Sequence, residues 1–294
     1  MSQPKNKRLA TFTSRNVPGA GVRLATRDYG GQGAPLLLLH GAGMDQRSLE
    51  PLASELRTTF RVITFDFRGH GRTSRVPWTF DAAVRDAAAV ADAYRLGTPA
   101  IGGHSLGGMV AAAYARAHPT CPGAVNIDGH GRGRPGQYVG YSEAEVRALM
   151  DKQQRRLEAL TRGPAAAALR VLLVMLGKKP AATARTLREV IEEVDQLDPF
   201  SIYRDISCPL LIFNATQPEQ RRTMKILAGS GLALTRAYRA GLSRDLAALA
   251  DGNELIDVVE VDATHMLIRT HPELVARHLH SFLNAAARRT PTLG

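Results

Sequence analysis

The feature that most constrains the fold of this chain is the stretch at residues 99–118. A short apolar run ends at Gly103, Ser105 and Gly107 follow, and an alanine-rich helical pattern occupies residues 109–118. A serine between two glycines, after a strand and before a helix, is the nucleophile-elbow pattern, in which a strained backbone presents the hydroxyl at a sheet edge. The start of the following helix offers unpaired N–H groups. We therefore favour a serine nucleophile over a structural Gly-Ser turn.

Apolar runs and helical patterns alternate on both sides of this stretch. The expected strands are residues 9–14, 22–29, 35–39, 61–66, 99–103, 124–128, 208–213 and 255–261. The expected helices are residues 48–58, 80–96, 109–118, 219–250 (broken at 229–231 and at Gly241) and 271–287. Continuous apolar runs are typical of strands that are covered on both faces. The sequence therefore predicts an α/β protein with a parallel sheet between two helical layers.

The alternation stops between residues 142 and 197, where no strand pattern occurs. Three helical stretches are expected there, at residues 142–161, 164–176 and 181–197. Such a length exceeds that of an ordinary connection. We expect a core formed by residues 1–130 and 200–294, and a helical insertion formed by residues 131–199.

Charge and composition favour an ordinary globular protein over a nucleic-acid-binding one. The net charge is +11, but the basic residues are spread along the chain, and only 5% of residues are aromatic. A surface on which bases stack needs basic residues interleaved with aromatic ones. The hydrophobic content of 44% and the charged content of 22% are typical of globular proteins. We predict no nucleic-acid partner.

Segments for membrane insertion or secretion are not expected. No apolar run approaches the ~20 residues that cross a bilayer. The first residues are basic without an apolar stretch behind them, unlike a secretory signal. Cys121 and Cys208 each precede a proline and lack the spacing of a metal site or a disulfide framework. We expect both thiols to be reduced and the protein to be cytoplasmic.

Four motifs carry a family resemblance: residues 40–43 (HGAG), 66–71 (DFRGHG), 103–107 (GHSLG) and 262–265 (DATH). In this order and at these intervals they resemble the α/β-hydrolase fold. The resemblance implies a mostly parallel central sheet with helices on both faces and a helical cap, here residues 131–199, over the active site. The family includes esterases, lactonases, thioesterases, C–C bond hydrolases and cofactor-free haloperoxidases.

A serine hydroxyl needs a general base, and nine histidines compete for this role. His265 follows the last strand pattern, at the same sheet edge as Ser105, and the chain order of this fold favours it. His40 and His104 adjoin glycine turns and are expected to hold loops by hydrogen bonds. His70 and His130 are isolated loop residues. The remaining histidines, on helix ends or faces, are His118, His271, His278 and His280.

The oxyanion formed by attack on a carbonyl needs donors. The N–H of Leu106, at the start of the helix after Ser105, is one candidate. The family resemblance points to the N–H of Ala42 as the second. Asp66 and Asp262 are expected to organise their loops rather than to take part in the chemistry.

The third member of the triad is less obvious from the sequence. The family more often carries its acid just after the strand at 210–213, but here residues 216–218 are Thr, Gln and Pro. Some relatives carry the acid at the end of the preceding strand, where Asp128 stands. Glu219 is the rival. We favour Asp128, which keeps the order Ser105, Asp128, His265.

Together these observations predict a serine hydrolase that cleaves a carboxylic ester or lactone through an acyl-enzyme on Ser105. No metal-binding or dinucleotide motif is present, so neither a metal nor a cofactor is expected. The apolar residues Leu169 and 171–176 favour a small apolar substrate, or form the core of the insertion itself. Alternatives are a haloperoxidase-like or C–C bond hydrolase with the same triad, and a hydrolase-fold binding protein without turnover. The chain is expected to be a monomer or homodimer.

Overall fold

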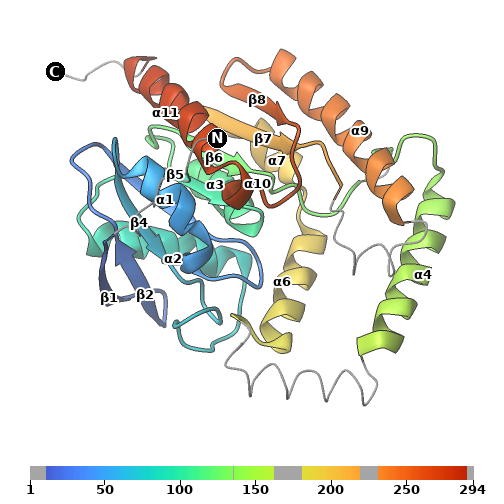
Figure 1. Cartoon of the computed structure of the whole chain (residues 1–294), viewed down its shortest axis with the longest axis horizontal. Coiled ribbons are helices and arrows are strands. Elements are labelled where there is room, and N and C mark those ends of the chain that lie inside the picture. The colour runs from blue at the N-terminus through green and yellow to red at the C-terminus, as the bar shows by residue number, and fades with distance from the viewer. Residues whose placement is uncertain (1–10, 135, 162–180, 219–230, 290–294) are drawn as a thin grey trace, which may run out of the picture.

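The computed structural model describes residues 11–134, 136–161, 181–218 and 231–289 (Figure 1). One sheet has the order β1-β2-β4-β3-β5-β6-β7-β8. Its strands are β1 Thr13–Pro18, β2 Arg23–Asp28, β3 Pro35–Leu39, β4 Arg61–Phe65, β5 Ala100–His104, β6 Ala124–Ile127, β7 Leu210–Ala215 and β8 Ile256–Val261. The β1–β2 and β2–β4 pairs are antiparallel, and every other pair is parallel. The predicted mostly parallel sheet is confirmed.

Helices cover both faces of the sheet (Figure 1). One face packs on α1 Glu50–Leu56, which the 3₁₀ turn Gln46–Leu49 precedes, α10 Leu267–Thr270 and α11 Pro272–Arg289. The other face packs on α2 Phe80–Ala93, α3 Leu106–Ala117, α7 Pro199–Arg204 and α9 Gly231–Asp251. The side chains of β3 alternate between the two apolar cores, Leu36 and Leu38 facing one and Leu37 and Leu39 the other. This two-sided burial explains the continuous apolar run in the sequence.

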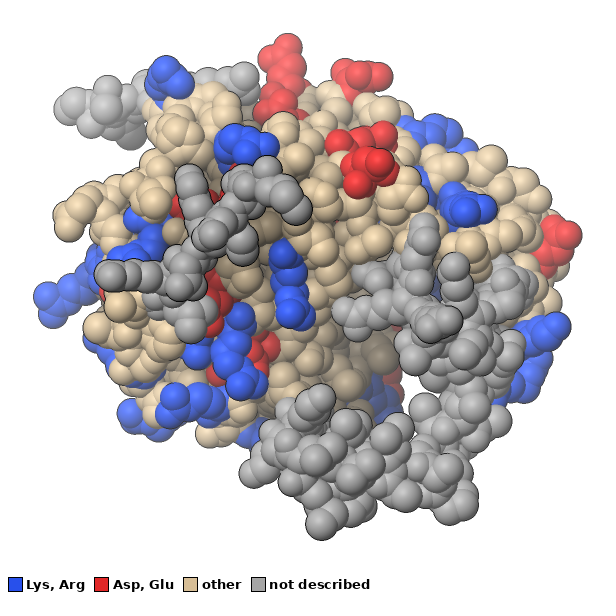
Figure 2. Space-filling model, viewed as in Figure 1, with Lys and Arg blue, Asp and Glu red and all other residues tan. Residues whose placement is uncertain are grey.

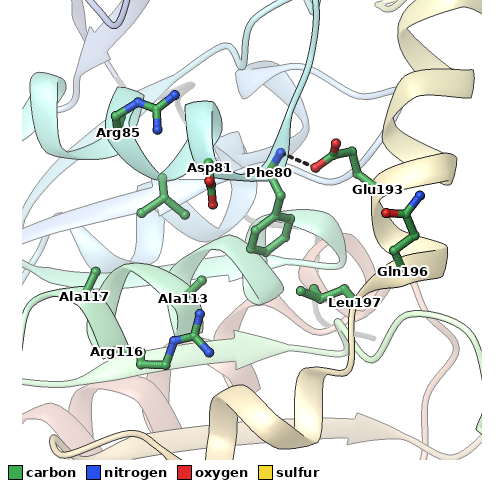
Figure 3. Close-up of a pocket in the computed structure, with 10 residues that line it drawn as sticks. Phe80, Asp81, Arg85, Ala113, Arg116, Ala117, Glu193, Gln196 and Leu197 are labelled. Carbon is green, nitrogen blue, oxygen red and sulfur yellow. Dashed lines mark hydrogen bonds between the residues drawn. The ribbon is translucent and has the colours of Figure 1, made fainter.

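Two further helices, α4 Glu143–Thr161 and α6 Ala184–Gln196, stand away from the sheet beside α9 and α2 (Figure 1). They match the first and third helical stretches expected in the insertion, and the second, residues 164–176, lies outside the described residues. Two carboxylates fix α6 to the start of α2. The N–H of Trp78 donates to Glu189 Oε2 at 3.0 Å. The N–H of Phe80 donates to Glu193 Oε2 at 2.9 Å (Figure 3). Negative charge is favourable at a helix N-terminus, so this contact holds α6 in place.

The expected break at Gly241 is wrong, because α9 continues through it to Asp251. Gly241 instead allows a close approach of two backbones, since a Cβ there would lie 1.9 Å from the carbonyl oxygen of Gln137. The helix α7 was not expected. It begins at Pro199, and the N–H of Phe200 donates to the side chain of the N-cap Asp198. The strand β1 begins at Thr13, where its pairing with β2 starts. Residues 9 and 10, where the first strand was expected to begin, lie outside the described residues.

On the face shown in Figure 2, Lys and Arg side chains are interspersed with Asp and Glu rather than gathered in one stripe. Within the described residues, no helix has the length and apolar character needed to cross a bilayer. Cys121 and Cys208 are buried free thiols just before β6 and β7.

Candidate active site

Ser105 directly follows β5 and has φ 55° and ψ −120°, a backbone conformation that residues other than glycine rarely adopt. Gly103 and Gly107, two residues before and two residues after Ser105, make this turn possible. A Cβ at Gly103 would lie 2.3 Å from the backbone of Gly107, and one at Gly107 would lie 2.5 Å from the carbonyl oxygen of Leu39. The Ser105 N–H donates to the carbonyl of Ile127 at 2.9 Å, which ties the turn to the end of β6. Backbone strain of this kind is concentrated at functional sites.

Ser105 opens into a cavity of about 470 Å³ at the carboxyl ends of the parallel strands. Asp128 and His265 line the same cavity, as do Ala42 and Leu106. Its apolar wall comes from α3 and α6 and consists of Met109, Val190, Ile191 and Val194. Its polar wall includes His130, Arg132, Asp195, Tyr238 and Arg239. All five residues singled out in the sequence therefore meet at one place.

Two residues that line this cavity have main-chain N–H groups without a partner among the described residues. The N–H groups of Leu106, the first residue of α3, and of Ala42 form no hydrogen bond to any other residue in the part of the chain that the structure describes. The N–H of Gly43, next to Ala42, donates to His70 Nε2 at 3.3 Å. This bond holds the loop that carries Ala42 against the segment at residues 66–72.

Buried neutral histidines hold the loop between β3 and α1. Burial lowers the pKa of His40 and of His70 to about 4, so both rings are neutral at pH 7. His40 donates through Nδ1 to the carbonyl of Gly41 and accepts the N–H of Phe67 at Nε2. This agrees with the loop-holding role expected for His40. His70, which appeared isolated in the sequence, has a similar bracing role.

His265 lies in the loop after β8, and two contacts fix it. Its Nδ1 donates to Asp128 Oδ2 at 2.6 Å, and its carbonyl accepts a hydrogen bond from His104 Nε2 at 2.7 Å. The His104 and His265 rings lie 4.6 Å apart between centroids. Ser105 Oγ forms no hydrogen bond with a residue that the structure describes.

Asp128 follows β6 in a second tight turn, with φ 57°. The side chain of Asn126 builds this turn, because it accepts the N–H of Gly129 and donates to the carbonyl of Gly129, both at 2.8 Å. The Asp128 side chain is fully buried. Its Oδ1 also accepts the N–H of Ala215 at 3.0 Å, from the end of the neighbouring β7.

The Asp128 carboxylate also pairs with a cation. Arg239 on α9 donates through Nη1 to Oδ1 at 2.6 Å and through Nη2 to Oδ2 at 2.9 Å, and His130 Nε2 lies 3.7 Å from Oδ1. Burial by itself raises the pKa of Asp128, but the hydrogen bonds from His265 and Arg239 and the charge of Arg239 hold that pKa well below its usual range. Sequence reasoning missed Arg239, because nothing in the helical pattern distinguishes it from the other arginines of the chain.

The end of β7, where the family more often carries its acid, makes other contacts here. The N–H of Thr216 donates to the carbonyl of Val261, and the side chain of Gln217 donates to Asp262. Glu219, the rival acid, lies outside the described residues. Among the described carboxylates, Asp128 alone hydrogen bonds His265. Asp262 and Asp66 have the loop contacts expected of them, since Asp66 accepts the N–H groups of Gln46 and Arg72.

A separate hollow of about 420 Å³ lies between α2, α3 and α6, with Phe80, Arg116 and Glu193 in its walls (Figure 3). None of the predicted site residues lines it. Across the residues that the structure describes, no three side chains of His, Cys, Asp or Glu converge as metal ligands would.

The model of the alpha/beta hydrolase family matches residues 36–278. The chain belongs to this family. It is 30% identical over 131 residues to a 2-hydroxy-6-oxononadienedioate/2-hydroxy-6-oxononatrienedioate hydrolase of Burkholderia vietnamiensis, covering 41% of this chain and 44% of that protein. It is 39% identical over 90 residues to the pimeloyl (acyl-carrier protein) methyl ester esterase of Chromobacterium violaceum, covering 30% of this chain and 34% of that protein. These alignments span less than half of either relative.

A solved structure extends the comparison of the fold to nearly the whole chain. The enol-lactonase from Burkholderia xenovorans superposes with a TM-score of 0.61 at 21% identity, covering 92% of this chain and 100% of that one. At this identity the likeness shows a common fold. The relatives act on different bonds, so the reaction of this chain has to be argued from its own site.

Proposed function

We propose that this protein is a serine hydrolase that cleaves a carboxylic ester or lactone through an acyl-enzyme on Ser105. The observation that carries the proposal is the content of one cavity. The residues that line it supply a hydroxyl on a strained turn, an imidazole hydrogen bonded to a buried carboxylate, and two main-chain N–H groups that have no partner among the described residues. This is the set of groups that acyl transfer requires.

The chemistry follows from the atoms that remain free. His265 Nδ1 is bound to Asp128, which leaves Nε2 to accept the Ser105 proton as Oγ attacks the substrate carbonyl. Asp128 stabilises the imidazolium that forms. The N–H groups of Leu106 and Ala42 donate to the oxyanion, and loss of one such donor typically costs ~3 kcal/mol. The imidazolium then protonates the leaving alcohol, and a water molecule, deprotonated by His265, releases the acid.

We further propose that residues 131–199 form a cap that selects the acyl group. Val190, Ile191 and Val194 of α6 lie beside Met109 in the apolar wall of the cavity. Ile191 is 54% exposed, so its side chain is open to contact with a substrate in the cavity that it lines. A cavity of about 470 Å³ favours small acyl groups.

Labelling by a fluorophosphonate tests the nucleophile, since the reagent modifies only an activated serine. We expect one adduct, mapped to Ser105 by mass spectrometry, and none in Ser105→Ala. Hydrolysis of p-nitrophenyl esters and lactones of graded size then tests the reaction. A chain that is neither labelled nor active would be a binding protein. A labelled chain that hydrolyses no ester or lactone but cleaves a C–C bond or oxidises halide would belong to one of the alternative reaction classes.

A further inference from the structure

Four hydrogen bonds saturate the carboxylate of Asp128. Oδ1 accepts from the N–H of Ala215 and from Arg239 Nη1, and Oδ2 accepts from Arg239 Nη2 and from His265 Nδ1. Two of the four come from one guanidinium. Such a fork fixes the plane of a carboxylate as well as its position. The oxygen that contacts His265 is therefore oriented by Arg239.

The segment that carries Arg239 is itself held firmly. Gly241 packs against the carbonyl of Gln137, and Gln137 Nε2 donates to Asp245 on α9 at 2.9 Å. The N–H of Val139 donates to the carbonyl of Ala237 at 3.3 Å. The Arg239 side chain is 14% exposed. The guanidinium thus has little freedom to leave Asp128.

A fixed positive charge next to Asp128 also changes how strongly the carboxylate favours an imidazolium at His265. Of the other groups around this pair, His104 and His130 are neutral at pH 7, because burial lowers the pKa of each to about 4. Tyr203 and Tyr238 are neutral too, because burial raises their pKa. Arg132 and Asp195 also line the cavity, but they pair with each other at 3.1 Å between Nε and Oδ1. Among the described residues, Arg239 is therefore the cation that pairs directly with Asp128 and offsets its negative charge.

We propose that Arg239 is a positioning residue of the site, which acts through Asp128 by fixing the plane of its carboxylate and by offsetting its negative charge. This inference rests on the proposed function. It predicts that Arg239 acts only through Asp128 and that its charge and its fork geometry have separable effects.

Steady-state hydrolysis of p-nitrophenyl butyrate from pH 5 to 9 tests both effects. In Arg239→Met, we expect kcat to fall roughly tenfold with KM unchanged, because the carboxylate loses its orientation. The acid limb of kcat/KM should move up by about half to one pH unit, because the imidazolium loses a repelling charge. Arg239→Lys should keep the limb where it is, since the charge remains, but recover only part of kcat. Arg236→Met, an exposed change on the same helix, is the matched control and should alter neither.

The Asp128→Asn background shows whether Arg239 acts through Asp128. In the Asp128→Asn background, Arg239→Met should lower kcat by less than about twofold, because the effects of coupled residues are not additive. A full tenfold loss in that background would overturn the proposal, since Arg239 would then act on the substrate directly. If Arg239→Met does not fold by circular dichroism, Arg239→Lys decides, and a shifted acid limb in that folded variant would also overturn it.

One measurement separates this inference from the proposed function. The pH midpoint at which the His265 ring resonances titrate by NMR, assigned with His265→Gln, requires no turnover. It should rise in Arg239→Met and stay in place in Arg236→Met. An unchanged midpoint in an enzyme that hydrolyses esters overturns the inference alone. A raised midpoint in a chain without ester turnover or fluorophosphonate labelling supports the electrostatic effect and rejects the hydrolase.

Discussion

Ser105 and Asp128 both directly follow a strand and both have positive φ, 55° and 57°, yet different forces hold them. Around Ser105 the constraint is the backbone itself, since Gly103 and Gly107 leave no room for a Cβ. Around Asp128 a glycine is crowded as well, since a Cβ at Gly129 would lie 2.1 Å from the carbonyl oxygen of Ser105. Side chains add a further constraint there, because Asn126 forms the turn and Arg239 binds the carboxylate. The half of the site around Ser105 (the backbone half) is thus set mainly by its glycines, whereas the half around Asp128 (the side-chain half) also depends on hydrogen bonds from distant elements.

The largest expected effect tests the side-chain half. Asp128→Asn keeps the shape but removes the charge, so we expect kcat to fall by about 10³ to 10⁴, as for triad acids in general. Gln217→Ala, at the end of the neighbouring β7, is the control and should change kcat less than about twofold. Steady-state hydrolysis of p-nitrophenyl butyrate measures both. Similar losses of kcat in the two variants would mean that Asp128 is not the acid of the triad.

Substitution of a glycine in the backbone half should instead lower the stability of the fold. Gly107→Ala places a Cβ 2.5 Å from the carbonyl oxygen of Leu39, so we expect the free energy of unfolding to fall by about 3 kcal/mol. Gly252→Ala is a matched control, because the nearest atom to its Cβ would be 3.5 Å away. Urea denaturation followed by circular dichroism compares the two. A stable Gly107→Ala would mean that the turn tolerates a side chain and is not set by crowding.

Both halves should lose stability together in acid. His40, His70, His104 and His130 have pKa values lowered by burial to about 4, whereas an unfolded histidine has a pKa near 6.5. Their neutral forms therefore contribute stability that is complete above about pH 6.5 and lost as the pH falls towards 4. Each should contribute a slope of up to about 1.4 kcal/mol per pH unit.

Urea midpoints between pH 7 and pH 4 measure this slope. His70→Asn, in the loop region near Ala42, and His130→Asn, beside Asp128, should each reduce the pH dependence of the urea midpoint. If neither substitution changes the pH dependence, the buried rings do not supply it.

The smallest effect concerns the apolar wall. Ile191→Ala should lower kcat/KM for p-nitrophenyl butyrate relative to the acetate by about three- to tenfold, which corresponds to one or two buried methylenes. Glu192→Gln, the exposed neighbour on α6, should leave the ratio unchanged. An unchanged ratio in Ile191→Ala would place the acyl group elsewhere in the cavity.

The same contrast explains how much the sequence could predict. The elbow is encoded within a few residues, so its turn, its helix and its strand could be identified directly. Strands buried on both faces were equally visible as apolar runs. Asp128 was harder, because its contacts with Ala215, Arg239 and His265 lie 87, 111 and 137 residues away. Arg239 was not identified at all, since only tertiary packing brings α9 to the end of β6.

Two predictions failed or fell short for the same reason. Gly241 was treated as a helix break, but its missing side chain serves the contact with Gln137. His70 was treated as an isolated loop residue, but it is fully buried and accepts the N–H of Gly43. A glycine or a histidine in a sequence gives its local preference, whereas its neighbours in space decide its use.

The two carboxylates that tie α6 to α2 have a consequence for selectivity. Glu189 and Glu193 are one helical turn apart, so they hold the helix along its axis rather than at a single pivot. Val190 and Val194, adjacent to these anchors, should then keep a constant spacing from Ser105 through successive turnovers. Discrimination between acyl chains would accordingly depend on a helix position that is already fixed before an ester binds.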